Sequence, residues 1–107
     1  MNIYKNNELI FNEAKISGPN GLMFKKKLKE NQSIIMVLQN ESQFGSSIHM
    51  FFVFFPIYVV WMNKDRIIVD IRKAYPFQPL VIPKNKSIYI LECTKLPKIK
   101  IGDKLSF

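Results

Sequence analysis

The chain has 107 residues, of which 48% are hydrophobic and 22% are charged, and its formal net charge is +8. These proportions exclude a disordered chain and suit a folded protein in which residues 1–107 form a single domain. The single cysteine excludes an intramolecular disulfide and favours a reducing compartment, and the N-terminus lacks the apolar segment of a signal peptide. We therefore predict a cytoplasmic location.

The first half of the chain predicts short strands and one helix. Residues 8–16 predict a strand, with a bulge or twist where the apolar positions change face. A short helix is predicted at 21–28, and Asn20 would cap its first turn. A continuously apolar strand is predicted at 33–38, followed by a polar surface loop at 39–47.

The run at 48–62 has no Asp, Glu, Lys or Arg and is the most apolar part of the chain. It is shorter than the roughly 20 residues of a membrane-spanning helix, and Pro56 would interrupt helical hydrogen bonding near its middle. Aromatic residues and valine are abundant, and both favour strands. We therefore predict no membrane span, and two strands at 48–54 and 57–62 that are buried on both faces.

The second half of the chain continues the β pattern. A hairpin is predicted at 59–71, and three prolines in 72–83 predict an extended crossover. Further strands are predicted at 87–93 and at 98–101, where apolar residues alternate with lysine. The prediction is an all-β, mostly antiparallel fold, either barrel-like or a sandwich, with one short helix.

Four segments occur in an order that characterises one family: Gly21–Lys25; Phe55–Ile57; Asp65 with Val69–Ile71; and Tyr89–Glu92 with Ile99–Asp103. Over residues 15–107 the chain therefore resembles the small prokaryotic proteins called domain of unknown function 192. The resemblance implies a compact β-barrel-like domain with a short helix near its start. It implies no established activity and transfers no catalytic residues. Two features depart from the family pattern. Tyr58 stands where the family commonly has an acidic residue, and residues 49–52 stand where many relatives have a stretch similar to Trp-Met-Lys-Asn.

Few residues in the sequence are suited to catalysis. His49 and Cys93 are single representatives of their types, whereas a zinc site needs three or four ligands. The glycine-rich loops that bind phosphate do not occur. We interpret His49 as a hydrogen-bonded structural residue and Cys93 as a small buried hydrophobe, with a nucleophilic pair of the two as the alternative. We predict no catalytic residue, no metal and no cofactor.

Aromatic residues near the proline-rich crossover are candidates for a binding surface. They would line a shallow groove for a ligand or peptide, or else simply close one end of the barrel. The same surface could pair two copies of the chain as a homodimer. The candidate groove residues are His49, Tyr58, Trp61, Tyr75 and Phe77.

The positive charge suggests a second class of partner. Only two of the sixteen basic residues are arginine, the residue that makes forked contacts to phosphate and guanine. Lysines at the end of the predicted helix form a candidate basic patch, or else a solubilising surface: Lys25, Lys26, Lys27 and Lys29. We predict a non-catalytic binding or interaction domain, with a nucleic-acid-binding module as the alternative.

Overall fold

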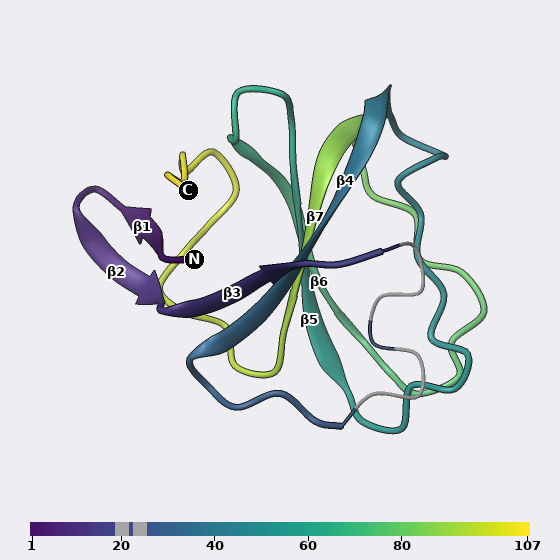
Figure 1. Ribbon diagram of the computed structural model, residues 1–107. Helices are drawn as coiled ribbons and strands as arrows, with labels where there is room; N and C mark the ends of the chain where they lie inside the picture. Colours follow the sequence, from purple (N-terminus) through teal and green to yellow (C-terminus); the bar gives the residue numbers. More distant parts are fainter. Residues whose placement is uncertain (19–21, 23–25) are drawn as a thin grey trace.

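Figure 1 shows the computed structural model, which describes residues 1–18, 22 and 26–107. The described residues form strands and loops and contain no helix, so they include no helix able to cross a membrane. The strands are β1 (Ile3–Lys5), β2 (Glu8–Phe11), β3 (Glu13–Ile16), β4 (Gln32–Ser42), β5 (Ile57–Met62), β6 (Ile68–Ala74) and β7 (Ser87–Cys93). The all-β class is confirmed.

Five strands form one sheet in the order β3-β4-β7-β5-β6, and β1 pairs with β2 in a separate hairpin. β3 runs parallel to β4, and the other neighbours in the sheet are antiparallel. The mostly antiparallel arrangement is therefore confirmed. The barrel is wrong, because the outer described strands, β3 and β6, are not paired with each other and the sheet stays open.

The predicted helix at 21–28 is not seen at its described positions. Leu22 lies in a turn, and residues 26–28 have no regular structure. The carbonyl oxygen of Leu28 accepts a hydrogen bond of 2.9 Å from Thr94 Oγ1, so this backbone group is bound to the residue after β7 instead of to a helical turn. Residues 20, 21 and 23–25 lie outside the described part of the chain.

The apolar run at 48–62 contains one strand instead of two. β5 occupies 57–62 as predicted, but 48–54 is not a strand. Ile48 exchanges two backbone hydrogen bonds with Val81 in an isolated bridge, and Met50 bonds to the backbone at 77 and 78. Phe52 has a left-handed φ of 59°, which ends the extended geometry that a strand needs. The prediction that both faces of this run are buried is also wrong, because three phenylalanines are exposed: Phe51, Phe52 and Phe54.

Two apolar cores cover the two faces of the sheet. The first core joins the sheet to the loops after β4 and β6, and includes Ile34, Met50, Val53, Val59, Trp61, Val81 and Ile90. The second core joins the sheet to both chain termini, and includes Ile3, Phe11, Ile35, Val60, Leu91, Cys93 and Leu105. In Figure 1 the loops lie to the right of the sheet, and the β1–β2 hairpin and the C-terminus lie to its left.

The later strands have mixed outcomes. The predicted hairpin at 59–71 and the strand at 87–93 are confirmed. The predicted strand at 98–101 is wrong, because its backbone closes a turn. Lys100 N donates to Asp103 Oδ2 at 2.8 Å, and Asp103 N donates to the Lys100 carbonyl at 3.1 Å. These bonds occupy the backbone groups that a strand ladder would need.

Trp61 connects the loop after β4 to the sheet. Its side chain is fully buried in the first core, and its Nε1 donates a hydrogen bond of 2.7 Å to the carbonyl oxygen of Ser46. Ser46 Oγ in turn donates to the carbonyl oxygen of Ser42 at 2.6 Å. The indole therefore fixes the position of the loop as well as filling the core.

We predict that Trp61→Phe lowers the free energy of unfolding by about 2–4 kcal/mol, because it leaves a void and an unpaired buried carbonyl. Urea denaturation followed by circular dichroism measures this change. The matched control is Tyr75→Phe at an exposed position, which should change stability by less than about 0.5 kcal/mol. Equal stabilities for the two variants would contradict the role assigned to the indole.

Candidate functional site

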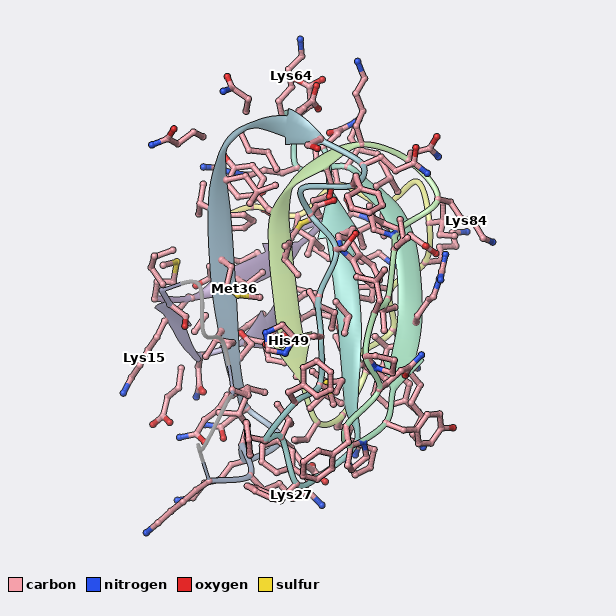
Figure 2. All side chains as sticks on the ribbon, turned by 90° about the vertical axis from the view of Figure 1, so that its right-hand side faces the viewer. Lys15, Lys27, Met36, His49, Lys64 and Lys84 are labelled. Carbon is pink, nitrogen blue, oxygen red and sulfur yellow. The ribbon has the colours of Figure 1, made fainter. Side chains whose placement is uncertain are left out.

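A pocket of about 310 Å³ lies on the loop side of the sheet, against β4 and β7. We call it the loop-side pocket. Its apolar wall is formed by Leu22, Met36, Ile48, Val53 and Ile90. Figure 2 looks onto this side, with His49 in front of β7 and Met36 on the neighbouring β4. The volume is at the lower end of the range for small-molecule sites, which is roughly 300–1,000 Å³.

Glu92 brings a carboxyl group to this apolar pocket. It sits on β7 opposite Ile34 of β4 and Val59 of β5, which are both buried. Glu92 is only 3% exposed, and its Oε1 atom has no hydrogen-bond partner among the described residues. Burial raises the pKa of this carboxyl to about 7. A buried, unpaired carboxyl destabilises the fold, and such groups concentrate at functional sites.

Ser47 brings a second unpaired polar atom to the same pocket. Its Oγ is buried and has no hydrogen-bond partner within the described part of the chain. His49 lies two residues further on and also lines the pocket, but its side chain is exposed. Its Nδ1 accepts a hydrogen bond of 3.3 Å from Phe51 N. The pocket therefore combines apolar walls with four described polar side chains, those of Ser17, Ser47, His49 and Glu92.

A family model described as "Uncharacterized ACR" and named DUF192 matches residues 10–107. The chain belongs to the DUF192 family. A UPF0127 protein of Thermococcus kodakarensis is 38% identical over 72 residues, which cover 67% of this chain and 44% of that protein. A UPF0127 protein of Pyrococcus horikoshii is 32% identical over 91 residues, which cover 81% of this chain and 76% of that protein. The match thus spans less than half of the Thermococcus relative.

Two solved structures share the fold of this DUF192 chain. A protein of unknown function from Novosphingobium aromaticivorans superposes with a TM-score of 0.79 at 18% identity, covering 99% of this chain and 82% of that one. A protein from Sinorhizobium meliloti gives a TM-score of 0.75 at 17% identity, covering 88% of this chain and 78% of that one. At these identities the similarity establishes the fold alone.

The five groove residues predicted from the sequence are not gathered in one place. Only His49 lines the loop-side pocket. Trp61 is fully buried and its N–H is already bonded to Ser46, so it presents no polar group to a ligand. Tyr58 packs against the second core, on the opposite face of the sheet. Tyr75 and Phe77 are exposed on the loop after β6.

Phe77 instead belongs to an exposed aromatic tip, which we define as Phe51, Phe52, Phe54 and Phe77. The ring of Phe77 meets those of Phe52 and Phe54 edge-on, with centroids 6.1 and 5.4 Å apart. Phe77 has a left-handed φ of 62°, as Phe52 also does. Sequence reasoning placed three of these phenylalanines in a buried strand, so it missed the surface that they form.

The predicted basic patch is only partly described. Lys26, Lys27 and Lys29 are exposed, whereas Lys25 lies outside the described residues. Lys26 and Lys27 line a second hollow of about 460 Å³ together with Lys15 of β3. Other lysines point elsewhere: Figure 2 shows Lys64 at the top and Lys84 at the right, far from Lys27 at the bottom.

We predict that Glu92→Gln becomes more stable relative to the wild type as pH rises. The difference in their free energies of unfolding should change by about 3 kcal/mol between about pH 4.5 and pH 8. The folded pKa of Glu92 is raised from an ordinary value of 4.5 to about 7. The wild type therefore loses stability as pH rises through this window, because the unfolded carboxyl ionises more easily. Urea denaturation at both pH values measures the difference.

The matched control for this experiment is Glu30→Gln, which removes an exposed carboxyl. Its stability should follow the wild type closely across the same pH range. If Glu92→Gln also follows the wild type, Glu92 is not held in the desolvated position described above.

Proposed function

We propose that this DUF192 chain is a non-catalytic domain that binds a small molecule in the loop-side pocket. The observation that carries the proposal is that Glu92 and Ser47 line the same apolar pocket, and that each has a buried polar atom, Oε1 and Oγ respectively, without a described partner. Small-molecule sites combine apolar walls with a few polar groups that orient the ligand. A bound ligand would supply the hydrogen bonds that the protein leaves unmade.

The environment of Cys93 supports a binding role over nucleophilic catalysis. Cys93 packs into the second core, whereas Glu92 lines the pocket on the other face of β7. Burial, with a smaller contribution from the Glu92 charge, raises the pKa of the Cys93 thiol to about 12. The thiol is therefore neutral at physiological pH, and the neutral form is a poor nucleophile.

Two accompanying proposals concern the setting of the protein. We propose a cytoplasmic location, which the single, buried Cys93 without a disulfide partner in the chain supports. We also propose that two copies pair through the exposed aromatic tip. The exposure of Phe54, at 60%, supports that pairing, because contact would remove apolar area from water. Residues 1–107 would act as one domain in either setting.

We predict that filling the pocket weakens binding of a small neutral aromatic probe. Benzyl alcohol should bind the wild type weakly, in roughly the millimolar range that suits a fragment of its size. Met36→Trp should weaken this binding at least about tenfold, because the larger side chain occupies the pocket. Ligand-observed NMR titration measures both affinities.

The matched control is Leu80→Trp, which adds the same side chain at an exposed position outside the pocket. It should bind benzyl alcohol as the wild type does. Equal binding by Met36→Trp and the wild type would place the probe elsewhere and defeat the proposed site.

Nucleic-acid binding is the second candidate function, and the shared hollow of Lys15, Lys26 and Lys27 favours it. We predict that single-stranded oligonucleotides bind no more tightly than about micromolar at roughly 0.15 M salt, and that binding weakens steeply with added salt. Fluorescence anisotropy titrations measure this dependence. Submicromolar binding that is lost in Lys15→Ala/Lys26→Ala/Lys27→Ala would make nucleic-acid binding the leading function.

A further inference from the structure

We propose that the ligand of the loop-side pocket is a primary amine with a compact apolar body, whose ammonium group binds Glu92 and Ser47. This inference rests on the proposed function and adds the chemical class of the ligand. It follows from the two polar atoms left unpaired at the pocket, from the absence of a described cation beside them, and from the apolar walls.

The Glu92 carboxylate requires a hydrogen-bond donor. An ionised carboxylate has acceptor sites only, so its partner must donate hydrogen bonds. The flanking strands present Ile34 and Val59 to it, and neither can donate from its side chain. Arg72 lies one strand further away, opposite Val59, and its Nε already pairs with Asp70 Oδ2 at 3.1 Å. No described side chain therefore donates to Glu92 Oε1, and a bound molecule that carries N–H or O–H groups would supply the donor.

The bound molecule should carry enough donors for both Glu92 and Ser47. Ser47 lines the same pocket, and its Oγ is also buried without a described partner. A primary ammonium has three N–H donors, enough for both oxygen atoms, whereas an alcohol has one and a quaternary ammonium has none. Hydrogen bonds between charged partners are roughly twice as strong as neutral ones. A primary amine therefore matches the pocket better than an alcohol of the same shape.

The pocket walls and volume limit the size and polarity of the rest of the ligand. The wall side chains Leu22, Ile48, Val53 and Ile90 are apolar, and the volume of about 310 Å³ admits only a small molecule. The body of the amine should accordingly be a short alkyl chain or a single ring. The net charge of +8 repels cations at long range. The affinity must then come from local contacts inside the pocket, not from electrostatic steering.

Protonation of Glu92 provides a signature of this binding mode. An ammonium group needs the ionised carboxylate, and burial raises the pKa of Glu92 to about 7, so binding below that pH must release a proton. His49 is the other titratable side chain that lines the pocket. On the neighbouring strands β4 and β5, the residues opposite Glu92 are Ile34 and Val59, whose side chains do not titrate. Cys93 faces the opposite core. A His49→Gln variant therefore isolates the Glu92 contribution.

The test compares amines with alcohols of matching shape on the full chain: benzylamine with benzyl alcohol, and butylamine with butanol. At about pH 8 we expect at least one amine to bind about tenfold or more tightly than its alcohol. Between about pH 8 and pH 6 the amine should lose about tenfold in affinity in both the wild type and His49→Gln, while the alcohol is unchanged. Isothermal titration calorimetry in two buffers also measures the released proton.

Two variants locate the effect. Glu92→Gln should remove both the preference for the amine and its pH dependence, and Ser47→Ala should reduce the preference severalfold. Circular dichroism of each variant checks that it is folded. Equal binding of amine and alcohol at about pH 8 would overturn the ligand class and leave the proposed function standing. Absence of binding by all four probes would overturn both.

Discussion

The burial of β7 on both faces is the constraint on which the rest of the structure depends. β7 is the middle strand of the sheet, paired with β4 on one side and with β5 on the other. The loops cover one of its faces and the chain termini cover the other. Residues 90–93 are consequently almost wholly buried, whatever their chemistry. This arrangement encloses the Glu92 carboxyl and keeps the neighbouring thiol neutral.

The loop-side pocket depends on how the loop after β4 is attached to the sheet. Trp61 bonds to the backbone of Ser46, and the next residue along the loop is Ser47, which lines the pocket. Ile48 is then fixed by its two backbone bonds to Val81 of the second loop. Core packing and ligand access are therefore coupled, because the same short segment supplies an anchor, a polar group and part of the apolar wall.

The sequence allowed the sheet to be predicted better than the loops. The segments 57–62 and 87–93 were predictable because aromatic and β-branched residues are concentrated between clear turn signals. Residues 48–54 have the same composition, yet they form an irregular segment that buries Met50 and Val53 and exposes the rings between them. Composition cannot separate these two outcomes, because they differ in long-range pairing: 57–62 lies between β6 and β7, whereas the backbone of 48–54 bonds to the loop after β6.

The site was harder to predict than the fold. Glu92 was visible as a lone charge in an apolar strand, and its spacing from Ile90 placed both side chains on one face. What could not be predicted is that this face would be covered, since the covering loops come from distant segments. The parallel pairing of β3 with β4 is another long-range result, because no turn connects strands that run in the same direction.

An open sheet has a consequence for self-assembly that a closed barrel would avoid. Its two outer strands carry backbone groups to which strands from other molecules can add, which is the first step toward fibrils. β3 is only four residues long and includes Glu13 and Lys15, and β6 carries Arg72 and Lys73. At the start of β6, Ile68 N donates to the Asp103 carbonyl at 2.8 Å, so the C-terminal segment covers part of that edge. Brevity, charge and this cover protect the chain from edge-to-edge aggregation.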